Sequence, residues 1–286
     1  MNVLWAVAWH LRYASHLGYR SADQPLFRDS VGSLDPVAHV EYAASLGLAG
    51  VQYALARGRP QEEQERVGAA VARCGLETGC VIYTTFEKLR QPLWSDTSRT
   101  ARETLSHELG LAIAAARRAG SKHLAVLSGS DPSQAEDRQR RAFIENLRWA
   151  AERAEKAGVV LLLESVDQSR LPGMLLHHID DAGEVAAAVG SSAVRLIFDT
   201  AHVQAMDGDA ARRLDACWDQ VELVQLADTP GRMEPGTGLV DFGAVLEALK
   251  RRQFTGLVEW EFNWSKSGRG AEQAGIESLR RLDAPA

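Results

Sequence analysis

The stretch "GVVLLLESV", from Gly158 to Val166, carries the clearest strand signal in the chain and contains an acidic residue, Glu164, near its end. It is almost continuously apolar, as expected of a parallel strand that is covered on both faces. The residues before it, roughly Ser133–Ala157, show the apolar periodicity of a helix. A helix that leads directly into a buried strand is the unit from which α/β folds are built.

The same unit repeats along the chain. Seven further runs are predicted to be strands, and they are Asn2–Trp9, Gly50–Leu55, Glu77–Tyr83, Lys122–Gly129, Val194–Thr200, Val221–Asp228 and Thr255–Phe262. The other predicted helices are Asp35–Gly50, Gln61–Arg73, Arg99–Ala119, Asp180–Val189, Asp209–Cys217, Asp241–Arg252 and Ala271–Leu282. Eight βα units in 286 residues without a linker predict an α/β protein with one TIM-barrel domain. A doubly wound sheet is the alternative, but it needs a glycine-rich turn after the first strand, and none is present.

One connection, His10–Leu34, is much longer than the usual loop of about 2 to 6 residues in a βα unit. In a barrel it would lie at the catalytic mouth, so we expect it to be a lid or a specificity loop. Trp9 and His10 end the first predicted strand. We therefore expect both of them to wall the mouth and to contact the substrate.

The composition and charge of the chain exclude several classes of function. The formal net charge is -6 and basic residues do not cluster, which argues against nucleic-acid binding. No apolar run reaches the roughly 18 residues of a membrane span. The three cysteines show no metal-type spacing, and the first apolar run lacks a basic leader. We expect a cytoplasmic protein that acts on a small molecule.

Acidic and amide side chains fall at the ends of four consecutive predicted strands. They are Glu164, Asp199, Gln225 and Glu261. Because barrel active sites form at the carboxyl ends of the strands, these side chains should converge. Converging carboxylates repel each other, and oxygen ligands suit Mg²⁺ or Mn²⁺. The alternative is that each acid caps the next helix or pairs with an arginine.

The stretch "QLADTPGRMEPGTG", from Gln225 to Gly238, puts unusual charge and turn-forming residues after a strand. Arg232 is permanently charged and is expected to reach the anionic or hydroxyl end of a substrate, or else to form a salt bridge within the loop. Glu234 is expected to pair with Arg232 or to fix the loop. His202, three residues after Asp199, is expected either to contact a substrate oxygen or to cap a helix.

The second half of the chain resembles the hydroxypyruvate isomerase branch of the xylose-isomerase-like sugar isomerase and epimerase barrels. The segments that carry the resemblance are "LLLESV", "IFDTAHVQAMDGD", "VQLADTPGRMEPGTGLVDF" and "GLVEWEF". The resemblance implies a TIM barrel, usually oligomeric, that binds a divalent metal. It implies that the ligands are Glu164, Asp199, Gln225 and Glu261. It also implies that Glu164 and Glu261 form the acid/base pair and that His202 and Arg232 contact the substrate.

Three residues depart from this resemblance. Gln52 replaces a glutamate that these barrels commonly carry in the second strand, and Asn263 replaces a lysine. Glu259 lies one layer below Glu261, where a buried charge needs a partner or a proton. Together these differences suggest a changed or larger substrate.

The strand-end residues alone, without the family resemblance, are consistent with proton transfer next to a carbonyl group. Moving a carbonyl between adjacent carbons requires a base to remove one proton and return another, while a metal stabilises the enediolate charge. One glutamate acting on one face gives an isomerase, and two glutamates on opposite faces give an epimerase. A lyase or dehydratase and a barrel that only binds its ligand remain open as alternatives.

Overall fold

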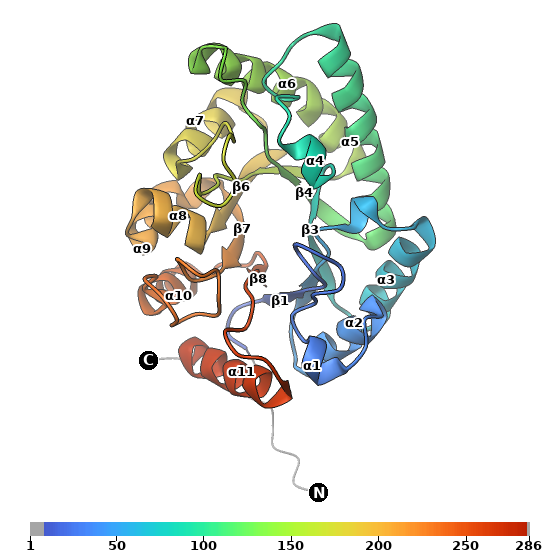
Figure 1. Cartoon of the computed structure of the whole chain (residues 1–286), viewed down its shortest axis with the longest axis vertical. Helices are drawn as coiled ribbons and strands as arrows, with labels where there is room; N and C mark the ends of the chain where they lie inside the picture. Colours follow the sequence, from blue (N-terminus) through green and yellow to red (C-terminus); the bar gives the residue numbers. More distant parts are fainter. Residues whose placement is uncertain (1–8, 285–286) are drawn as a thin grey trace, which may run out of the picture.

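The chain folds into a closed ring of eight parallel strands that follow one another in sequence order, with helices outside the ring (Figure 1). The structure is a computed structural model, and it describes residues 9–284. The strands are β1 Tyr13–His16, β2 Gly50–Gln52, β3 Glu77–Ile82, β4 Ser121–Val126, β5 Val160–Leu163, β6 Val194–Asp199, β7 Val221–Leu226 and β8 Val258–Trp260. The helices are α1 Arg28–Val31, α2 Pro36–Ser45, α3 Gln61–Arg73, α4 Phe86–Leu89, α5 Arg99–Ala119, α6 Glu136–Ala157, α7 Ile179–Val189, α8 Thr200–Asp207, α9 Ala210–Cys217, α10 Phe242–Arg251 and α11 Arg269–Asp283, with 3₁₀ helices η1 Ala56–Gly58 and η2 Trp218–Gln220. The predicted TIM barrel is confirmed.

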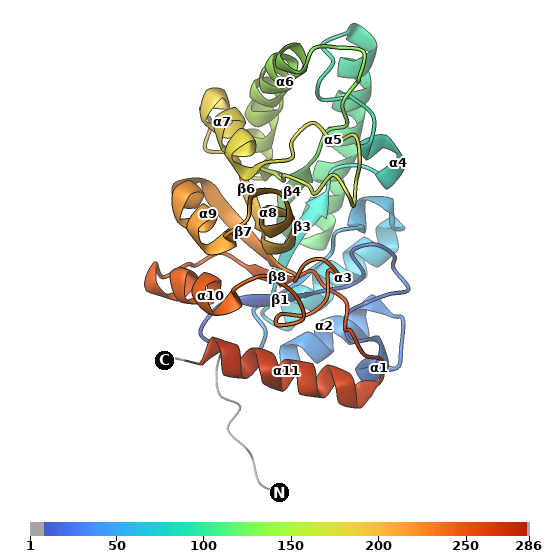
Figure 2. The same ribbon diagram turned by 60° about the vertical axis from the view of Figure 1, so that its left-hand side comes forward.

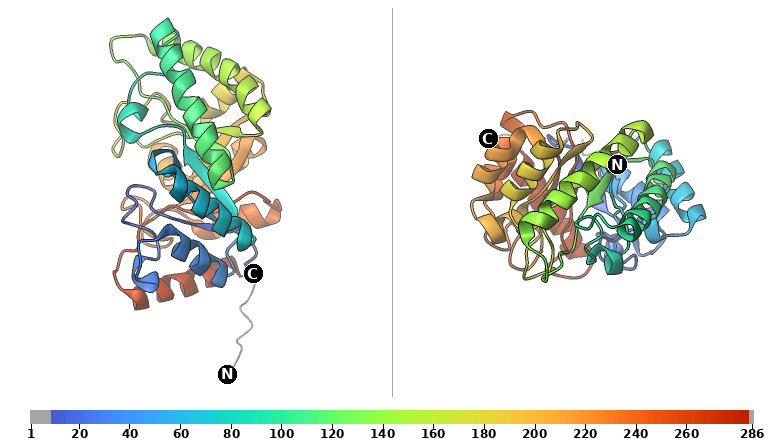
Figure 3. Two further views of the ribbon diagram at one scale, coloured as in Figure 1. Left: turned by 90° about the vertical axis from the view of Figure 1, so that its right-hand side faces the viewer. Right: turned by 90° about the horizontal axis from the view of Figure 1, so that it is seen from above.

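The long helices form where their periodicity and caps predicted them, and α3 and α5 have the predicted bounds. The hydroxyl of Ser98 accepts a hydrogen bond from the backbone N–H of Ala101 and so caps the start of α5. Gly120 ends α5 with a φ of 75°, a backbone conformation that glycine adopts without strain. Figures 1 and 3 show from several directions that these helices form the outer layer around the strands. Within residues 9–284, no helix is long and apolar enough to cross a membrane.

The first strand differs from the prediction. Of the predicted strand Asn2–Trp9, only Trp9 lies within the described residues, and it has no strand conformation. The barrel instead begins with β1, whose residues pair with β2 and β8. The predicted loop His10–Leu34 therefore contains a strand, which its short and weakly apolar sequence concealed. The connection that remains between β1 and α2 is 17–35, interrupted by α1.

This connection is anchored to the end of the chain. The carboxylate of Glu272, in α11, accepts hydrogen bonds from the backbone N–H groups of Asp29 and Ser30 at 3.0 and 2.7 Å. The indole of Trp264 donates to the carbonyl of Leu26 at 2.8 Å. Figure 2 shows α11 running beside α1 and α2 along one side of the barrel. The segment after β1 is thus held by residues from the last βα unit.

The Glu272 contact gives a stability prediction. Replacing Glu272 by Ala leaves two backbone N–H groups without their acceptor, because Glu272 is only 2% exposed. We expect a loss of about 1–3 kcal/mol in the free energy of unfolding and faster proteolytic cleavage within 17–31. Urea unfolding and limited proteolysis measure both, with Glu277→Ala, on the exposed side of α11, as the control. Equal stability of the two variants would contradict the anchoring role.

Candidate active site

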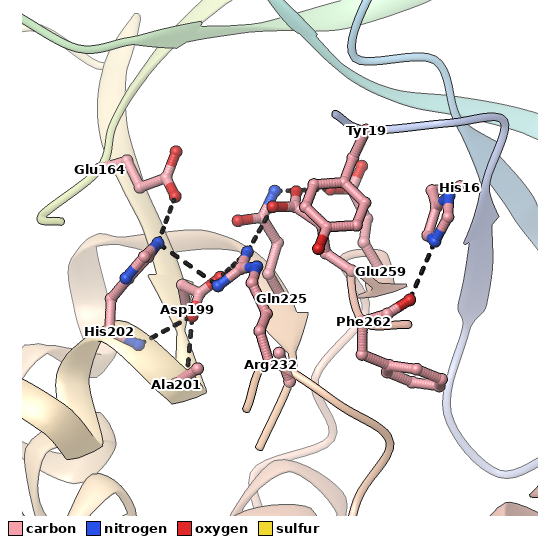
Figure 4. A network of polar contacts seen from close by, with 12 residues as sticks. His16, Tyr19, Glu164, Asp199, Ala201, His202, Gln225, Arg232, Glu259 and Phe262 are labelled. Atoms are coloured by element: carbon pink, nitrogen blue, oxygen red, sulfur yellow. Dashed lines mark hydrogen bonds and ion pairs between the residues drawn. The ribbon is translucent and has the colours of Figure 1, made fainter. Parts of the chain in front are cut away.

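The four predicted strand-end residues meet at the carboxyl ends of neighbouring strands, and Figure 4 shows three of them, Glu164, Asp199 and Gln225. Glu164 follows β5, Asp199 ends β6, Gln225 lies in β7 and Glu261 follows β8. Glu164, Gln225 and Glu261 line one cavity of about 610 Å³, together with His202 and Arg232. Asp199 lies beneath them and is 1% exposed. The structure therefore brings together every residue that was predicted to bind a metal.

Arg232 is the positive charge at the centre of this group. Its Nη2 lies 2.7 Å from Oδ2 of Asp199 and also contacts Oε1 of Glu261. The guanidinium is buried, and the two carboxylates raise its pKa although burial alone would lower it. Arg232 comes from the connection after β7, so its charge reaches the strand ends only if this loop is held in place. The sequence left open a salt bridge within the loop, but Arg232 instead pairs with carboxylates that lie outside the loop, at the ends of β6 and β8.

Asp199 has two partners at once. Its Oδ1 accepts hydrogen bonds from the backbone N–H groups of Ala201 and His202, at 2.9 and 3.0 Å, and so caps α8. Its Oδ2 pairs with Arg232. Burial would raise the pKa of Asp199, but the charge of Arg232 and contacts with His202 outweigh it and lower the pKa. The sequence pattern did not predict α8. This helix follows β6 without a loop, because Asp199 both ends the strand and caps the helix.

His202 faces Glu164 from the first turn of α8. Its Nδ1 accepts a hydrogen bond from the backbone N–H of Asp167 at 3.2 Å, so a neutral ring carries its proton on Nε2. That Nε2 lies 3.8 Å from Oε1 of Glu164 and 3.3 Å from Nη1 of Arg232. Burial lowers the pKa of His202 to about 4. A neutral imidazole can therefore donate a hydrogen bond into the cavity at neutral pH.

Within residues 9–284, Glu164 forms no salt bridge with a lysine or an arginine. Burial raises its pKa well above the usual value, and the negative charges of Glu261 and Asp199 raise it further. Burial also raises the pKa of Glu261, against the opposing effect of Arg232. Carboxyl groups with raised pKa values at a cavity wall are suited to accept and return protons near neutral pH.

Asp228 holds the loop that carries Arg232. Its two carboxylate oxygens accept hydrogen bonds from four backbone N–H groups, those of Thr229, Gly236, Gly238 and Val240, at 2.7–3.0 Å. A Cβ atom at Gly238 would lie 2.1 Å from the carbonyl oxygen of Thr229, so only glycine allows this approach. The backbone N–H of Arg232 itself donates to the carbonyl of Asp228 at 2.8 Å. The glycines and acids that made this stretch unusual thus form one folded loop.

Glu234 fixes the same loop from its other side. Its carboxylate accepts hydrogen bonds from the backbone N–H and the hydroxyl of Ser265, at 2.7 and 2.6 Å. The sequence left open whether Glu234 pairs with Arg232 or fixes the loop, and the second of these is observed. The loop after β7 is thereby tied to the loop after β8.

Glu259 is a completely buried carboxylate beneath the cavity. One oxygen accepts from the backbone N–H of Cys80 at 2.7 Å, and the other accepts from the amide nitrogens of Gln52 and Gln225 at 2.7 and 2.9 Å. The nitrogen of Gln52 also contacts Glu261. Because their amide nitrogens donate to Glu259, the amide oxygens of Gln52 and Gln225 turn away from it, and neither oxygen has a protein partner among the described residues.

Trp9 and His10 are not part of this group. They precede β1 and so lie at the opposite, amino-terminal end of the strands. The indole of Trp9 donates to the carbonyl of Leu46, and the backbone N–H of His10 donates to the carboxylate of Asp283. Neither residue lines the cavity. Their predicted position at the mouth was wrong because it depended on the displaced first strand.

Several residues of the candidate site were not predicted from the sequence. Tyr19 and Arg20, from the connection after β1, line the cavity, as does Arg170, from the connection after β5. Loop residues carry no periodicity, so no pattern could place them. Asp228 had a usable signal, because an acid followed by a turn with several glycines can accept many free backbone N–H groups.

The residues present fit a divalent cation. Single ligand atoms of Glu164, Asp199 and His202 lie within 4.8 Å of one another. The buried amide oxygen of Gln225, which lacks a protein partner in the described part of the chain, adds a further donor at the cavity wall. Carboxylate and amide oxygens are ligand types that divalent metals accept. His202 lies beside these groups, but its Nδ1 accepts from Asp167 and its Nε2 carries the proton, so the neutral ring is a hydrogen-bond donor and not a metal ligand. The substrate contact that the sequence suggested for His202 stays a prediction.

The match to a family model covers most of the chain. Residues 40–283 match the model described as xylose isomerase-like TIM barrel, and the chain belongs to this family. Among curated proteins, it is 28% identical to hydroxypyruvate isomerase of Escherichia coli (strain K12), over 81% of this chain and 89% of the relative. It is 27% identical to 2-oxo-tetronate isomerase of Haemophilus influenzae, over 78% of this chain and 85% of the relative.

Solved structures share the fold at lower identity. D-psicose 3-epimerase of Clostridium cellulolyticum H10, solved with D-tagatose, superposes with a TM-score of 0.76 at 14% identity, over 96% of this chain and 100% of that chain. A protein named IOLI, solved with a bound zinc atom, gives a TM-score of 0.70 at 15% identity, over 95% and 96%. At these identities the similarity shows the shared barrel.

The loop around Asp228 gives a second prediction. In Asp228→Asn, one accepting oxygen becomes an NH₂ group that faces backbone N–H groups. We expect a loss of about 2–4 kcal/mol in the free energy of unfolding, because buried N–H donors lose a charged acceptor. Urea unfolding measures this, with the exposed Asp137→Asn as the control. An Asp228→Asn variant as stable as the control would show that the carboxylate does not hold the loop.

Glu259 gives a pH prediction for the metal-depleted protein. Burial raises its pKa to about 8, against hydrogen bonds from Gln225 and Cys80 that lower it. Between about pH 4.5 and 8 the folded state therefore binds more protons at this carboxyl than the unfolded state, so stability falls as pH rises. Compared with Glu259→Gln, the unmutated protein should lose up to about 4 kcal/mol between pH 5 and pH 8. Parallel stability curves for the two proteins in urea would contradict the raised pKa.

Proposed function

We propose that the protein is a divalent-metal-dependent isomerase of a small hydroxy-carbonyl compound, of the hydroxypyruvate or keto-sugar-acid type. One observation carries the proposal: the buried carboxylates of Asp199 and Glu261 and the mostly buried carboxylate of Glu164 gather at one end of the barrel around the buried guanidinium of Arg232. An excess of buried negative charge requires a proton or a cation, and the free amide oxygen of Gln225 favours a cation. The names of the curated relatives, which are isomerases of hydroxypyruvate and 2-oxo-tetronate, agree with this chemistry.

The metal would be held by Glu164, Asp199, Gln225 and Glu261, with His202 beside them. Mg²⁺ or Mn²⁺ bound there would stabilise negative charge on the carbonyl and hydroxyl oxygens of the substrate. Glu164, which lines the cavity, removes the proton from the carbon next to the carbonyl. It then returns a proton to the neighbouring carbon, while the hydroxyl proton of the first carbon passes to the former carbonyl oxygen.

The other site residues orient the substrate. The Nε2–H of a neutral His202 donates a hydrogen bond to a substrate oxygen beside Glu164. Arg232 has further N–H groups beyond those that face Asp199 and Glu261, and these can hold a hydroxyl or carboxylate of the substrate. The segment 17–34 contributes Tyr19 and Arg20 to the cavity, which supports its role as a specificity loop.

A ketose epimerase is the second candidate, and a specific observation favours it. Glu164 and Glu261 follow strands β5 and β8, line the same cavity, and both have raised pKa values. Two such carboxylates on opposite faces of one carbon would invert its configuration. The two functions differ in the product, because the carbonyl moves in an isomerase and stays in place in an epimerase.

Proton exchange with solvent tests both candidates. Incubated with Mn²⁺ in D₂O, the protein should incorporate deuterium next to the carbonyl of hydroxypyruvate, tartronate semialdehyde, a keto-sugar acid or a ketose, followed by NMR after the metal is removed. We expect Glu164→Gln to reduce the exchange rate by about 10²-fold or more, because the base is lost. The NMR spectra of the product then show whether the carbonyl has moved.

The control for this experiment is Glu77→Gln. Glu77 lies at the amino-terminal end of β3, is mostly exposed and pairs with Arg12 outside the active-site cavity. The Glu77→Gln variant should catalyse deuterium exchange into the substrate at the same rate as the unmutated protein. Exchange that persists unchanged in Glu164→Gln would overturn the assignment of the base, and no exchange with any compound would overturn the proposed isomerase.

A further inference from the structure

The cavity is much larger than a three-carbon acid requires. Its volume of about 610 Å³ falls within the range of about 300–1,000 Å³ that surrounds drug-sized ligands. The carboxylates, His202 and Arg232 occupy only the side formed by β5 to β8. The remaining lining comes from β3 and β4 and from the connections after β1 to β5, and most of its large side chains are apolar or basic.

The side formed by β3 and β4 is apolar. In an eight-strand ring, β3 and β4 stand across from β7 and β8, which carry Gln225 and precede Glu261. Large apolar side chains line this side and the connection after β5, interrupted by the polar Arg90, Ser169 and Arg170, and they are Ile82, Phe86, Leu89, Leu127, Val166 and Leu171. Leu89, Leu127 and Val166 are buried, whereas Phe86 is 43% exposed at the mouth. We refer to these six residues as the apolar wall.

Three arginines stand at the mouth without an ion-pair partner. Arg20, Arg90 and Arg170 line the cavity, and none of them forms a salt bridge with any of the described residues 9–284. Arg170 donates to the carbonyl of Pro230 at 3.3 Å and so leans toward the loop that carries Arg232. Burial lowers the pKa of Arg170, and the charges of Arg232 and Arg20 lower it further.

The carboxylate of Asp167 attracts Arg170 but forms no salt bridge with any arginine of the described residues. Both carboxylate oxygens of Asp167 are engaged by Ser169, through its backbone N–H at 2.8 Å and its hydroxyl at 2.9 Å. Arg20 and Arg170 therefore present positive charge to the cavity mouth. Guanidinium groups held close together without a counter-ion favour a carboxylate or a phosphate.

We propose that the substrate is an anionic hydroxy-carbonyl compound with a hydrocarbon body, in which the reacting head lies at the carboxylates, the body lies against the apolar wall, and a terminal carboxylate or phosphate is held by Arg20 and Arg170. This inference rests on the proposed function, because it assigns the head of the substrate to the same carboxylates. It adds two subsites that a three-carbon acid would leave empty.

A fully hydroxylated sugar fits the apolar wall poorly. Each hydroxyl placed against Leu89, Leu127 or Phe86 would lose its hydrogen bonds to water without gaining a protein partner. A ring or alkyl chain in the same place gains free energy from burial of apolar surface. The composition of the wall therefore selects for hydrocarbon between the head and the anionic end.

Four probes with the same hydroxy-ketone head separate these subsites. Dihydroxyacetone has no apolar body, 2-hydroxyacetophenone has a body without an anion, and 4-(2-hydroxyacetyl)benzoate and 4-(2-hydroxyacetyl)phenyl phosphate have both. Calorimetry on the metal-depleted protein measures binding to these subsites without turnover. We expect the two anionic aryl compounds to bind at least about tenfold more tightly than 2-hydroxyacetophenone, and the latter more tightly than dihydroxyacetone. The order of the two anions distinguishes carboxylate from phosphate.

Two substitutions in the same metal-depleted protein assign the subsites. Arg170→Gln should weaken binding of the anionic probes about tenfold and leave 2-hydroxyacetophenone unchanged. Phe86→Gln should weaken all three aryl probes and leave dihydroxyacetone unchanged. Arg138→Gln and Leu111→Gln are the matched controls, because both residues are exposed on helices and do not line the cavity. They should bind all four probes like the parent.

Equal affinity for all four probes would overturn the proposal, and so would an Arg170→Gln variant that weakens neutral and anionic probes alike. The measurement is independent of turnover, so the two proposals fail in different ways. The expected order of affinities without solvent exchange in the unmutated protein would support these subsites and reject the isomerase. Exchange with a three-carbon acid, together with equal affinity for all probes, would reject only the subsites.

Discussion

The arrangement of the site depends on one electrostatic constraint, which is that Arg232 must lie between buried carboxylates at the ends of β6 and β8. A parallel barrel brings the strand ends to one mouth, so Glu164, Asp199 and Glu261 cannot avoid each other. Within the described residues, one buried guanidinium contacts two of these carboxylates. The third, Glu164, has a raised pKa because it is buried and lies near the negative charges of Glu261 and Asp199. This excess of negative charge is the basis of the proposed cation site and of the proposed base.

Other polar groups hold Arg232 and the side chains around it in position. Asp228 folds the loop that carries Arg232 by accepting four backbone N–H groups, and Glu234 ties the loop to its neighbour. Beneath the cavity, Glu259 holds the amide nitrogens of Gln52 and Gln225 and so determines where their oxygens point. Such supporting partners orient the groups that touch a metal or a substrate. The buried charge that looked unfavourable in the sequence is thus fully hydrogen-bonded.

The sequence predicted the parts of the molecule that local patterns encode. Helical periodicity located α3 and α5 to the residue, and acids after apolar runs located the site at the ends of β5 to β8. The first strand was misplaced because Tyr13–His16 is short and less apolar than the run before it, and Trp9 and His10 were misplaced with it. The partners of Glu259 and the lining from Phe86 to Arg170 come from distant segments. No periodicity records such contacts, so only the folded structure shows them.

The central claim is that the carboxylates and Gln225 form a site for one divalent metal. Titration of the metal-depleted protein with Mn²⁺, followed by electron paramagnetic resonance of the free ion, tests it without any assumption about the substrate. The account predicts one bound Mn²⁺ per chain. It also predicts weaker binding in Gln225→Leu and Asp199→Asn, with circular dichroism showing that both variants are folded. No bound Mn²⁺, or binding that is unchanged in both variants, would contradict the account.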